Sequence, residues 1–381
     1  MTALIAIASL SFIGFIYPYV IYPLVLRLFP KIPTLAPSQS ASAGAGDIRL
    51  SMFFCAYNEE ASLPDKIKNI REIKSKFPDV QVFAYSDASS DRTWELLHGA
   101  SDVITAVEGR ERAGKATGMR RIVSMSDCDV CVFTDANVLL DPESINNIRS
   151  YFRDPSIGTV AGTLHYISDD ETPTTVAGSA YWRLEEHIKH LESLTGSTMG
   201  ADGSIFSTRK SLYPEVPKNL LDDLIVSITP LFSGHRIISA KDVVAYERLV
   251  SSSKEEFKRK RRIACRAFST HLFIWPSVKK TSAENLFKYI SHKYIRWFGA
   301  IPLTLLIVSL FGIAVNVVGV LAAFALFSVA LAVAAMGYRM KAPIIAPLVE
   351  IALSIYATGW GVLEALTGKD YTTWTPAKSR A

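Results

Sequence analysis

Long apolar runs lie at both ends of the chain, and shorter apolar segments alternate with polar ones between them. Residues 2–26 and 299–338 contain no charged side chain, and both runs are longer than the ~20 residues that a helix needs to cross a bilayer. The first run lacks the basic start and the small-residue cleavage site of a signal peptide, so we expect a retained anchor over residues 2–30. The second run is predicted to turn near Asn316–Gly319 and to form a transmembrane hairpin.

A third apolar segment, residues 343–366, contains two glutamates. Arg27 and Lys31 follow the first run, and the preference for positive charge on the cytosolic side places the carboxyl end of that run in the cytosol. If the hairpin returns to the same side, another full span would put the basic tail (367–381) outside, against this preference. The third segment is therefore predicted either to span the membrane or to be re-entrant or interfacial.

Between the apolar runs, strand-like and helix-like patterns alternate. A helical repeat from Leu63 to Phe77 separates the first two strand-like runs, which are rich in β-branched and aromatic residues. This alternation predicts an α/β fold with a Rossmann-like, doubly wound sheet over residues 48–250. Small and polar residues at 31–47 are typical of a linker to the anchor. The predicted strands are Leu50–Cys55, Val80–Ser86, Val103–Val107 and Val130–Thr134.

The last of these strands ends in Asp135, Ala136 and Asn137. In open α/β sheets, ligands bind beyond the carboxyl ends of the strands, which is where these residues fall. Two side chains that carry oxygen atoms, two residues apart, can share one hard divalent cation that also holds a diphosphate. An isolated aspartate at a strand end is more often a turn former or a helix cap, so the motif gains weight only from its neighbours.

Polar residues also follow the other strands. Asp87 is placed to accept hydrogen bonds from a base or ribose, whereas Asp91 is expected to cap the helix that begins near Arg92. Lys115 precedes a helix, where it can neutralise a phosphate, although a solvated lysine is the simpler alternative. No G-x-G-x-x-G motif follows the first strand and no Walker A motif occurs, which argues against a dehydrogenase or a P-loop enzyme.

Asp222 and Asp223 form a carboxylate pair at the start of a predicted helix. Such a pair either complements the helix dipole or holds a general base at a useful pKa. A glycine-bracketed turn at 200–203 precedes the pair, after a long helix predicted from Thr174 to Leu194.

Charge and cysteine content narrow the class of protein. The formal net charge of +5 comes largely from basic clusters beside the apolar segments, which favours an anionic membrane surface over nucleic acid as a partner. The four cysteines lack the second pair or histidine cluster of a zinc site, so unpaired thiols in a reducing compartment are expected.

Residues 251–298 are amphipathic and basic, and are predicted to lie in the headgroup plane with some arginines turned toward a diphosphate.

Several motifs, in order, resemble those of membrane-bound family 2 glycosyltransferases, in the branch close to cellulose and poly-N-acetylglucosamine synthases. The resemblance covers about residues 50–297. The nucleotide-binding elements of the family match Tyr57-Asn58-Glu59, Ser86–Asp91 and Gly114-Lys115; its D-x-D motif matches Asp135-Ala136-Asn137; its acceptor-side turn matches Gly200-Ala201-Asp202-Gly203; its acid pair matches Asp222-Asp223; and its Q-x-x-R-W motif matches residues 259–263.

The resemblance implies a GT-A-type fold and an inverting glycosyltransferase that uses a nucleotide-sugar, expected to be a UDP-sugar. The implied acceptor is a lipid-linked molecule or a polysaccharide, in envelope or exopolysaccharide synthesis. The implied location is the bacterial inner membrane, with the catalytic domain in the cytosol. Subunits of envelope biosynthesis are candidate partners. The implied general base is Asp223, beside Asp222, and the implied Mg²⁺ or Mn²⁺ ion is bound by Asp135 and Asn137. The implied acceptor side is formed by Gly200, Asp202 and Gly203. The remaining residues of the implied donor site are Tyr57, Asn58, Glu59, Asp87, Lys115, Ala136, Arg259 and Arg262.

Four positions depart from the family's pattern, the first being Arg120, which falls where many members have asparagine after Gly-Lys. Asn137 replaces the second aspartate of D-x-D, Arg259 stands in place of glutamine, and Ile263 stands in place of tryptophan. That tryptophan stacks on the acceptor sugar in polymerising members, so its loss leaves an alternative: transfer of a single sugar to a ceramide-like or polyprenyl-linked lipid. A second alternative is an inactive scaffold subunit of an envelope complex, against which the nearly complete set of acidic positions argues.

Overall fold

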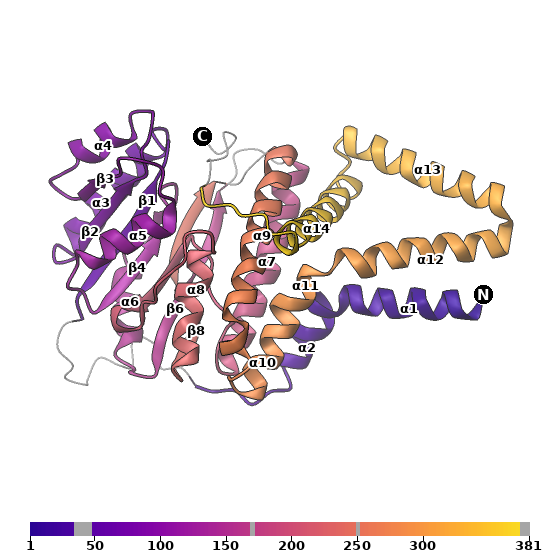
Figure 1. Ribbon diagram of the computed structural model, residues 1–381, viewed down its shortest axis with the longest axis horizontal. Helices are drawn as coiled ribbons and strands as arrows, with labels where there is room; N and C mark the ends of the chain where they lie inside the picture. The colour runs from indigo at the N-terminus through magenta and orange to yellow at the C-terminus, as the bar shows by residue number, and fades with distance from the viewer. Residues whose placement is uncertain (34–47, 168–171, 249–251, 374–381) are drawn as a thin grey trace.

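The computed structural model describes residues 1–33, 48–167, 172–248 and 252–373. Most of the predicted linker and half of the predicted tail, residues 34–47 and 374–381, lie outside this range. A sheet flanked by helices forms one part of the molecule, and apolar helices project from the other (Figure 1). The strands are β1 (Leu50–Ala56), β2 (Gln81–Ser86), β3 (Thr105–Glu108), β4 (Val130–Thr134), β5 (Leu139–Leu140), β6 (Ile157–Ile167), β7 (Ile205–Arg209) and β8 (Arg236–Arg248).

The eight strands form one sheet in the order β3-β2-β1-β4-β7-β6-β8-β5. The first four are parallel, as the strand–helix alternation predicts. Their connections include α3 (Leu63–Lys76), α4 (Thr93–Gly99) and α5 (Lys115–Ser124). β1 is buried along its whole length. Ring pairs join four neighbouring strands through Phe83, Phe53, Phe133 and Phe206, with centroids 5.4, 5.7 and 4.8 Å apart in turn.

The other half of the sheet is mixed, which differs from the doubly wound parallel sheet that was predicted. β7 runs antiparallel to both β4 and β6, with Ile205 opposite Thr134. The alternation of apolar and polar residues identifies a strand but not its direction, so this reversal is invisible in the sequence. It has a structural consequence: the chain enters β7 at the carboxyl edge of β4, which brings the preceding turn at 200–203 beside Asp135.

Helices cover the mixed half and lead to the apolar part. α6 (Ser144–Phe152) and α8 (Asp222–Phe232) contact β6 and β8, while α7 (Pro173–Leu194) contacts β8 and the apolar helix α14. The basic segment forms α9 (Ser253–Val278), followed by α10 (Ala283–Tyr289), a π-helical turn (Ile290–Tyr294) and α11 (Ile295–Trp297). α9 packs along α14 and also contacts α8, so it joins the apolar helices to the sheet.

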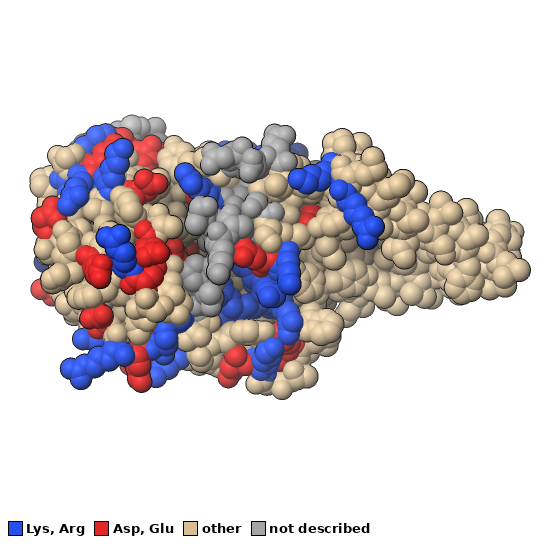
Figure 2. Space-filling view, turned by 90° about the horizontal axis from the view of Figure 1, so that it is seen from above, with Lys and Arg blue, Asp and Glu red and all other residues tan. Residues whose placement is uncertain are grey.

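Within the described part of the chain, four helical segments are long and apolar enough to cross a membrane: Thr2–Leu26, Ala300–Val318 (α12), Val320–Arg339 (α13) and Ile345–Leu366 (α14). The first comprises α1 (Thr2–Ile16), a π-helical turn (Tyr17–Ile21) and α2 (Tyr22–Leu26). Gly319, with φ +84°, separates α12 from α13, as the predicted turn requires. α1, α12 and α13 project together, whereas α14 lies at their base against α7 and α9 (Figure 1). Seen from above, the outer part of the projection shows no charged side chains, and Lys and Arg side chains lie only toward its base (Figure 2).

Candidate active site

Three carboxylates and one ammonium group meet beyond the carboxyl end of β4. Asp135 follows β4, Lys115 begins α5, and Asp222 and Asp223 begin α8. The Lys115 Nζ lies 2.7 Å from Asp135 Oδ1 and 3.9 Å from Asp222 Oδ2. A Cβ atom added to Gly203 would lie 3.0 Å from Asp223 Oδ2, 3.3 Å from Lys115 Nζ and 3.7 Å from Asp135 Oδ2. Glycine at this position leaves the space between these three charged groups open.

The charged groups of this cluster alter the pKa of two members, Asp223 and Lys115. Burial, followed by the neighbouring Asp222 carboxylate, raises the pKa of Asp223 to about 7. Burial opposes the charge on Lys115, but Asp135, Asp222 and Asp223 outweigh it and raise the pKa of the lysine. Near neutral pH, Asp223 can therefore take up a proton while Lys115 stays cationic.

Arg266 of α9 is a member of the cluster that the sequence did not single out. It is buried, donates a hydrogen bond to the carbonyl oxygen of Leu220, and places Nη2 3.7 Å from Asp222 Oδ1. One turn later, the Thr270 hydroxyl accepts a hydrogen bond from the Leu221 N–H at 2.8 Å. α9 thus fixes the start of α8, where the acid pair lies. In the sequence, Arg266 is indistinguishable from the other basic residues of the amphipathic segment.

The oxygen atoms at Asp135 and Asn137 suit a hard divalent cation. The Asn137 amide nitrogen donates to Glu247 Oε1 at 3.1 Å, which leaves the amide oxygen on the opposite side of the group. Among the described residues, no group of three or more His, Cys, Asp or Glu side chains is arranged to hold a metal ion. The residues present therefore fit an ion such as Mg²⁺ or Mn²⁺ that takes one or two protein ligands and completes its shell with phosphate oxygens and water.

Asp87 holds the loop that leads to Lys115. Its buried carboxylate accepts hydrogen bonds from the backbone N–H groups of Ala113, at 2.8 Å, and Gly114, at 3.1 Å, and from Arg112 Nε at 3.2 Å. The Arg112 guanidinium also stacks on the Tyr57 ring, with its carbon 3.2 Å from the ring centroid. The structure thus gives Asp87 protein partners on a backbone loop, and the base or ribose contact expected for it stays a prediction.

Gly114 is expected to be irreplaceable in this loop. It has a φ of +84° and a ψ of +159°, and a Cβ there would lie 2.5 Å from the Thr372 carbonyl oxygen of the C-terminal segment. We expect Gly114→Ala to cost about 1–3 kcal/mol of loop stability, because this backbone region is almost confined to glycine. In Gly114→Ala, nucleotide titration should show weaker binding and thermal unfolding should show lower stability than in Gly99→Ala, where a Cβ meets open space. Equal nucleotide affinity in both variants would contradict this role.

The loops after β1 and β2 are tied to one another. Asn58, with φ +52°, accepts a hydrogen bond from the Ser90 N–H at 2.9 Å, and the Glu59 N–H donates to Thr93 Oγ1 at 2.8 Å. Asp91 accepts from the Thr93 N–H at 3.0 Å, so its carboxylate bonds to the first residue of α4, although Arg92 and not Asp91 occupies the N-cap position. The polar ends of these neighbouring strands therefore form one connected edge.

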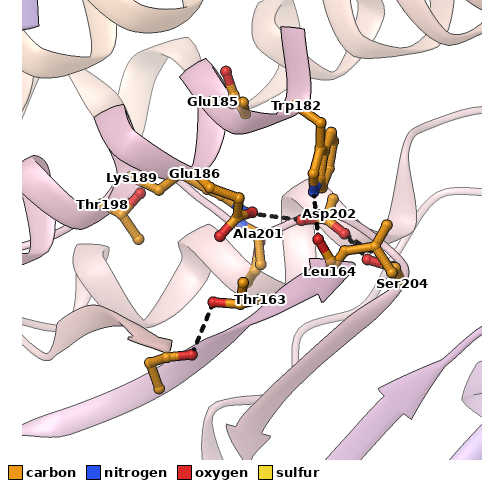
Figure 3. Close-up of polar contacts among 12 residues, drawn as sticks. Thr163, Leu164, Trp182, Glu185, Glu186, Lys189, Thr198, Ala201, Asp202 and Ser204 are labelled. Atoms are coloured by element: carbon orange, nitrogen blue, oxygen red, sulfur yellow. Dashed lines mark hydrogen bonds and ion pairs between the residues drawn. The ribbon is translucent and has the colours of Figure 1, made fainter. Parts of the chain in front are cut away.

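The predicted acceptor side is organised around Asp202 (Figure 3). Its carboxylate accepts hydrogen bonds from Lys189 Nζ at 3.0 Å and from the Ser204 N–H at 3.2 Å, and Lys189 is also paired with Glu186. Burial opposes the charge on Asp202, but Lys189 outweighs it and lowers the pKa of the carboxyl group. The turn at 200–203 is thus anchored to α7 through a charged, rigid contact.

Residues 51–216 match the protein-family model described as Glycosyl transferase family 2. The match, over less than half of the chain, indicates a glycosyltransferase. It is 21% identical over 222 residues to the O-antigen chain rhamnosyltransferase RfbN of Salmonella typhimurium, an alignment that covers 56% of this chain and 70% of that protein. Its structure resembles that of the mannosyltransferase PcManGT from Pyrobaculum calidifontis in complex with GDP-Man and Mn²⁺, with a TM-score of 0.71 and 19% identity over 96% of this chain and 99% of that one.

These findings identify the chain as a glycosyltransferase and confirm the predicted GT-A-type α/β fold. The matched region of the glycosyltransferase domain includes Lys115, Asp135 and the turn at 200–203. It ends before Asp222 and Asp223, so the acid pair is assigned to the cluster by its geometry alone. The predicted branch, close to cellulose and poly-N-acetylglucosamine synthases, stays a prediction.

A buried lysine supports the Asp135 loop of the glycosyltransferase domain from below. Lys66 of α3 donates to the Val138 carbonyl oxygen at 2.6 Å and to Thr134 Oγ1 at 3.3 Å. Burial lowers the pKa of Lys66 to about 7, with Asp135 acting in the opposite direction. In the sequence, Lys66 precedes Ile67 on the largely apolar face of α3 that also carries Leu63, Ile70 and Ile73, a position where a lysine requires polar partners.

The two arginines predicted for the diphosphate differ from the central cluster in their surroundings. Arg259 forms an ion pair with Glu256, one turn earlier on α9, and Arg262 is half-buried on the same helix. The neighbouring Arg261 pairs instead with Glu364 of α14. The basic segment therefore divides its charges between the glycosyltransferase domain and the apolar helices, and the roles of Arg259 and Arg262 at the donor stay predictions.

Proposed function

We propose that the chain is an inverting glycosyltransferase that moves a sugar from a nucleoside diphosphate sugar to a lipid-linked or polysaccharide acceptor at the cytosolic surface of a bacterial inner membrane. The observation that carries the proposal is the meeting of Asp223, Asp135 and Lys115 around Gly203, at the edge of the sheet where α/β folds bind ligands. It brings a carboxylate of raised pKa within reach of a site suited to a diphosphate.

The proposed reaction assigns a separate role to each of these groups. The acceptor hydroxyl oxygen attacks the anomeric carbon, the bond from that carbon to the diphosphate oxygen breaks, and Asp223 takes the hydroxyl proton. Lys115 faces the charge that develops on the departing nucleoside diphosphate. A Mg²⁺ or Mn²⁺ ion held by Asp135 and Asn137 would supply Lewis-acid stabilisation of the same diphosphate.

Asp222 and Arg266 would set the state of the base. Asp222 disfavours a second negative charge at Asp223, and Arg266 limits this effect by facing Asp222 at 3.7 Å. Because Arg266 of α9 faces Asp222, the pKa of Asp223 depends on the packing of α9 against α8. This makes the membrane-facing helix a structural support of the proposed base.

The pH dependence of turnover is expected to follow Asp223. The base accepts a proton only in its ionised form, and its pKa is raised to about 7. We therefore expect kcat/KM to be level above that pH and to fall by about tenfold per unit on the acid side. A profile measured over about two units on either side of pH 7 tests this, and a level acid side would contradict the assignment.

The apolar helices and the charges around them support a membrane location. α1, α12 and α13 present large exposed apolar side chains, while charged residues gather over the sheet and the base of the projection (Figure 2). In α14, Glu350 accepts hydrogen bonds from Thr174 Oγ1 at 3.0 Å and Tyr338 at 2.7 Å, and Glu364 pairs with Arg261. Carboxylates that face protein in this way support an interfacial or re-entrant position for α14, with α1, α12 and α13 spanning the bilayer.

The known relatives guide the choice of donor and acceptor. RfbN is an O-antigen chain rhamnosyltransferase and PcManGT was solved with GDP-Man, so the donors tested should include nucleotide-activated rhamnose and GDP-sugars beside the UDP-sugars implied by the resemblance. Ile263, in place of the stacking tryptophan, favours transfer of a single sugar over polymerisation. Incubation of the purified protein with a labelled nucleotide-sugar and bacterial lipid extract, followed by product sizing, separates these outcomes. One lipid-soluble band is expected, and a ladder of lengths would establish polymerisation instead.

A further inference from the structure

Glu247 reaches the Asp135–Asn137 motif from a distant part of the chain. The two-residue strand β5, directly after the motif, pairs antiparallel with β8, with Leu139 opposite Tyr246 and Leu140 opposite Ala245. This register brings Glu247 alongside the residues that precede β5. Its carboxylate accepts a hydrogen bond from the Asn137 amide nitrogen at 3.1 Å. The contact is thus built into the backbone pairing and does not depend on a flexible loop.

Glu247 is a carboxylate at a position where the strand pattern calls for an apolar residue. Val243, Ala245 and Glu247 alternate along β8 on its buried side, and Glu247 is only 5% exposed. A buried carboxylate is costly unless it is hydrogen-bonded or faces positive charge. Its placement beside Asn137 therefore points to a role at this motif.

The hydrogen bond decides which end of the Asn137 amide is available to a ligand. An asparagine side chain has one donor end and one acceptor end, and only the oxygen can bind a cation. A carboxylate partner accepts only, so Glu247 must face the amide nitrogen and the oxygen must lie on the other side. Glu247 thereby orients Asn137 as an oxygen ligand.

Glu247 also adds negative charge at a motif where Asn137 stands in place of a second aspartate. Burial opposes the charge on Arg259, but Glu256 and, to a smaller extent, Tyr166 and Glu247 raise the pKa of this arginine. Glu247 thus lies between the Asp135–Asn137 motif and one arginine of the predicted diphosphate site.

We propose that Glu247 is a positioning residue of the donor site, which holds the Asn137 oxygen toward a bound divalent cation and restores the negative charge that the motif lacks. The inference rests on the proposed function, because it concerns the cation of that same site. Partners that orient metal ligands from behind typically change metal affinity by about 10–100-fold when they are removed.

A charge exchange between the two positions tests this inference by metal binding instead of turnover. The affinity of the full-length, detergent-solubilised protein for Mn²⁺ would be measured by electron paramagnetic resonance in the presence of UDP and, separately, GDP. We expect Glu247→Gln, which keeps the side-chain shape, to weaken Mn²⁺ binding by about tenfold or more. Adding Asn137→Asp to Glu247→Gln should recover most of the affinity for Mn²⁺. The reason is that the glutamine amide at 247 can orient the new aspartate at 137 in the same way that the native Glu247 carboxylate orients Asn137.

Glu143→Gln is the matched control, because Glu143 is exposed and forms an ion pair with the exposed Lys76. The Mn²⁺ affinity of this variant should equal that of the native protein. Native-like binding in Glu247→Gln would overturn the inference, as would a double variant that binds as weakly as the single one at equal thermal stability. Absence of Mn²⁺ binding to the native protein with either nucleotide would contradict the proposed metal site itself, and the inference with it.

Discussion

Asp223→Asn should abolish nearly all sugar transfer while leaving nucleotide binding intact. A general base typically contributes about 10²–10⁴-fold to the rate, and asparagine cannot take the acceptor proton. Asparagine preserves the size of the side chain and can still accept the 2.7 Å hydrogen bond from the Leu224 N–H that aspartate accepts. The expected result is a fall in kcat of that size, measured as donor-dependent nucleotide release, with unchanged affinity for the nucleotide.

Asp102→Asn makes the same chemical change at an exposed ion pair with Arg71. Exposed pairs contribute at most about 1 kcal/mol to stability, so this variant should behave as the native protein. The comparison separates the loss of a base from a general loss of charge. Native turnover in Asp223→Asn would remove Asp223 from the mechanism and direct attention to Asp222.

Asp135→Ala should remove metal-dependent binding of the donor. Asp135 supplies the only carboxylate within the Asp135–Asn137 motif, and a cation at a diphosphate contributes several kcal/mol of charge stabilisation. At 1.36 kcal/mol per decade, we expect turnover to fall by at least about a hundredfold. Lys115 would lose its 2.7 Å partner but retain Asp222 as a neighbour at 3.9 Å, so the cluster should stay folded.

Asp127→Ala is the control for this change, because Asp127 is exposed just before the opposite end of the same strand, β4. Titration of Mn²⁺ in the presence of the nucleotide should show loss of binding in Asp135→Ala and none in Asp127→Ala. Equal Mn²⁺ binding in both variants would show that the cation, if used, is held elsewhere.

The residues at strand ends and helix starts were predictable because short-range rules place them. Local patterns predict that a strand ends before Asp135 and that helices begin at Lys115 and Asp222. Because the first strands are parallel, Asp135 and Lys115 are expected at the same edge of the sheet. The structure brings Lys115, Asp135 and the acid pair together, as the motifs suggested. Their order along the chain could not show that the lysine contacts two of the carboxylates.

The supports of the site were not predictable, because they depend on tertiary contacts. Arg266 was one of several basic residues on an amphipathic helix, and only the packing of α9 against α8 brings it to Asp222. Glu247 reaches Asn137 through the register of β5 and β8, two strands far apart in the sequence. The antiparallel entry of β7, which carries the turn at 200–203 to Asp135, has no signature in the pattern of apolar residues either.

Nucleotide release from the purified full-length protein tests most directly whether the chain transfers sugar with Asp223 as its base. The protein, in detergent with bacterial lipid extract and Mn²⁺, would be incubated with UDP-sugars, GDP-sugars and nucleotide-activated rhamnose in turn, beside Asp223→Asn as the inactive reference. We expect acceptor-dependent release with one donor or a small related group, and none above background in Asp223→Asn. Release from no donor in the panel, or equal release by the native protein and Asp223→Asn, would contradict it.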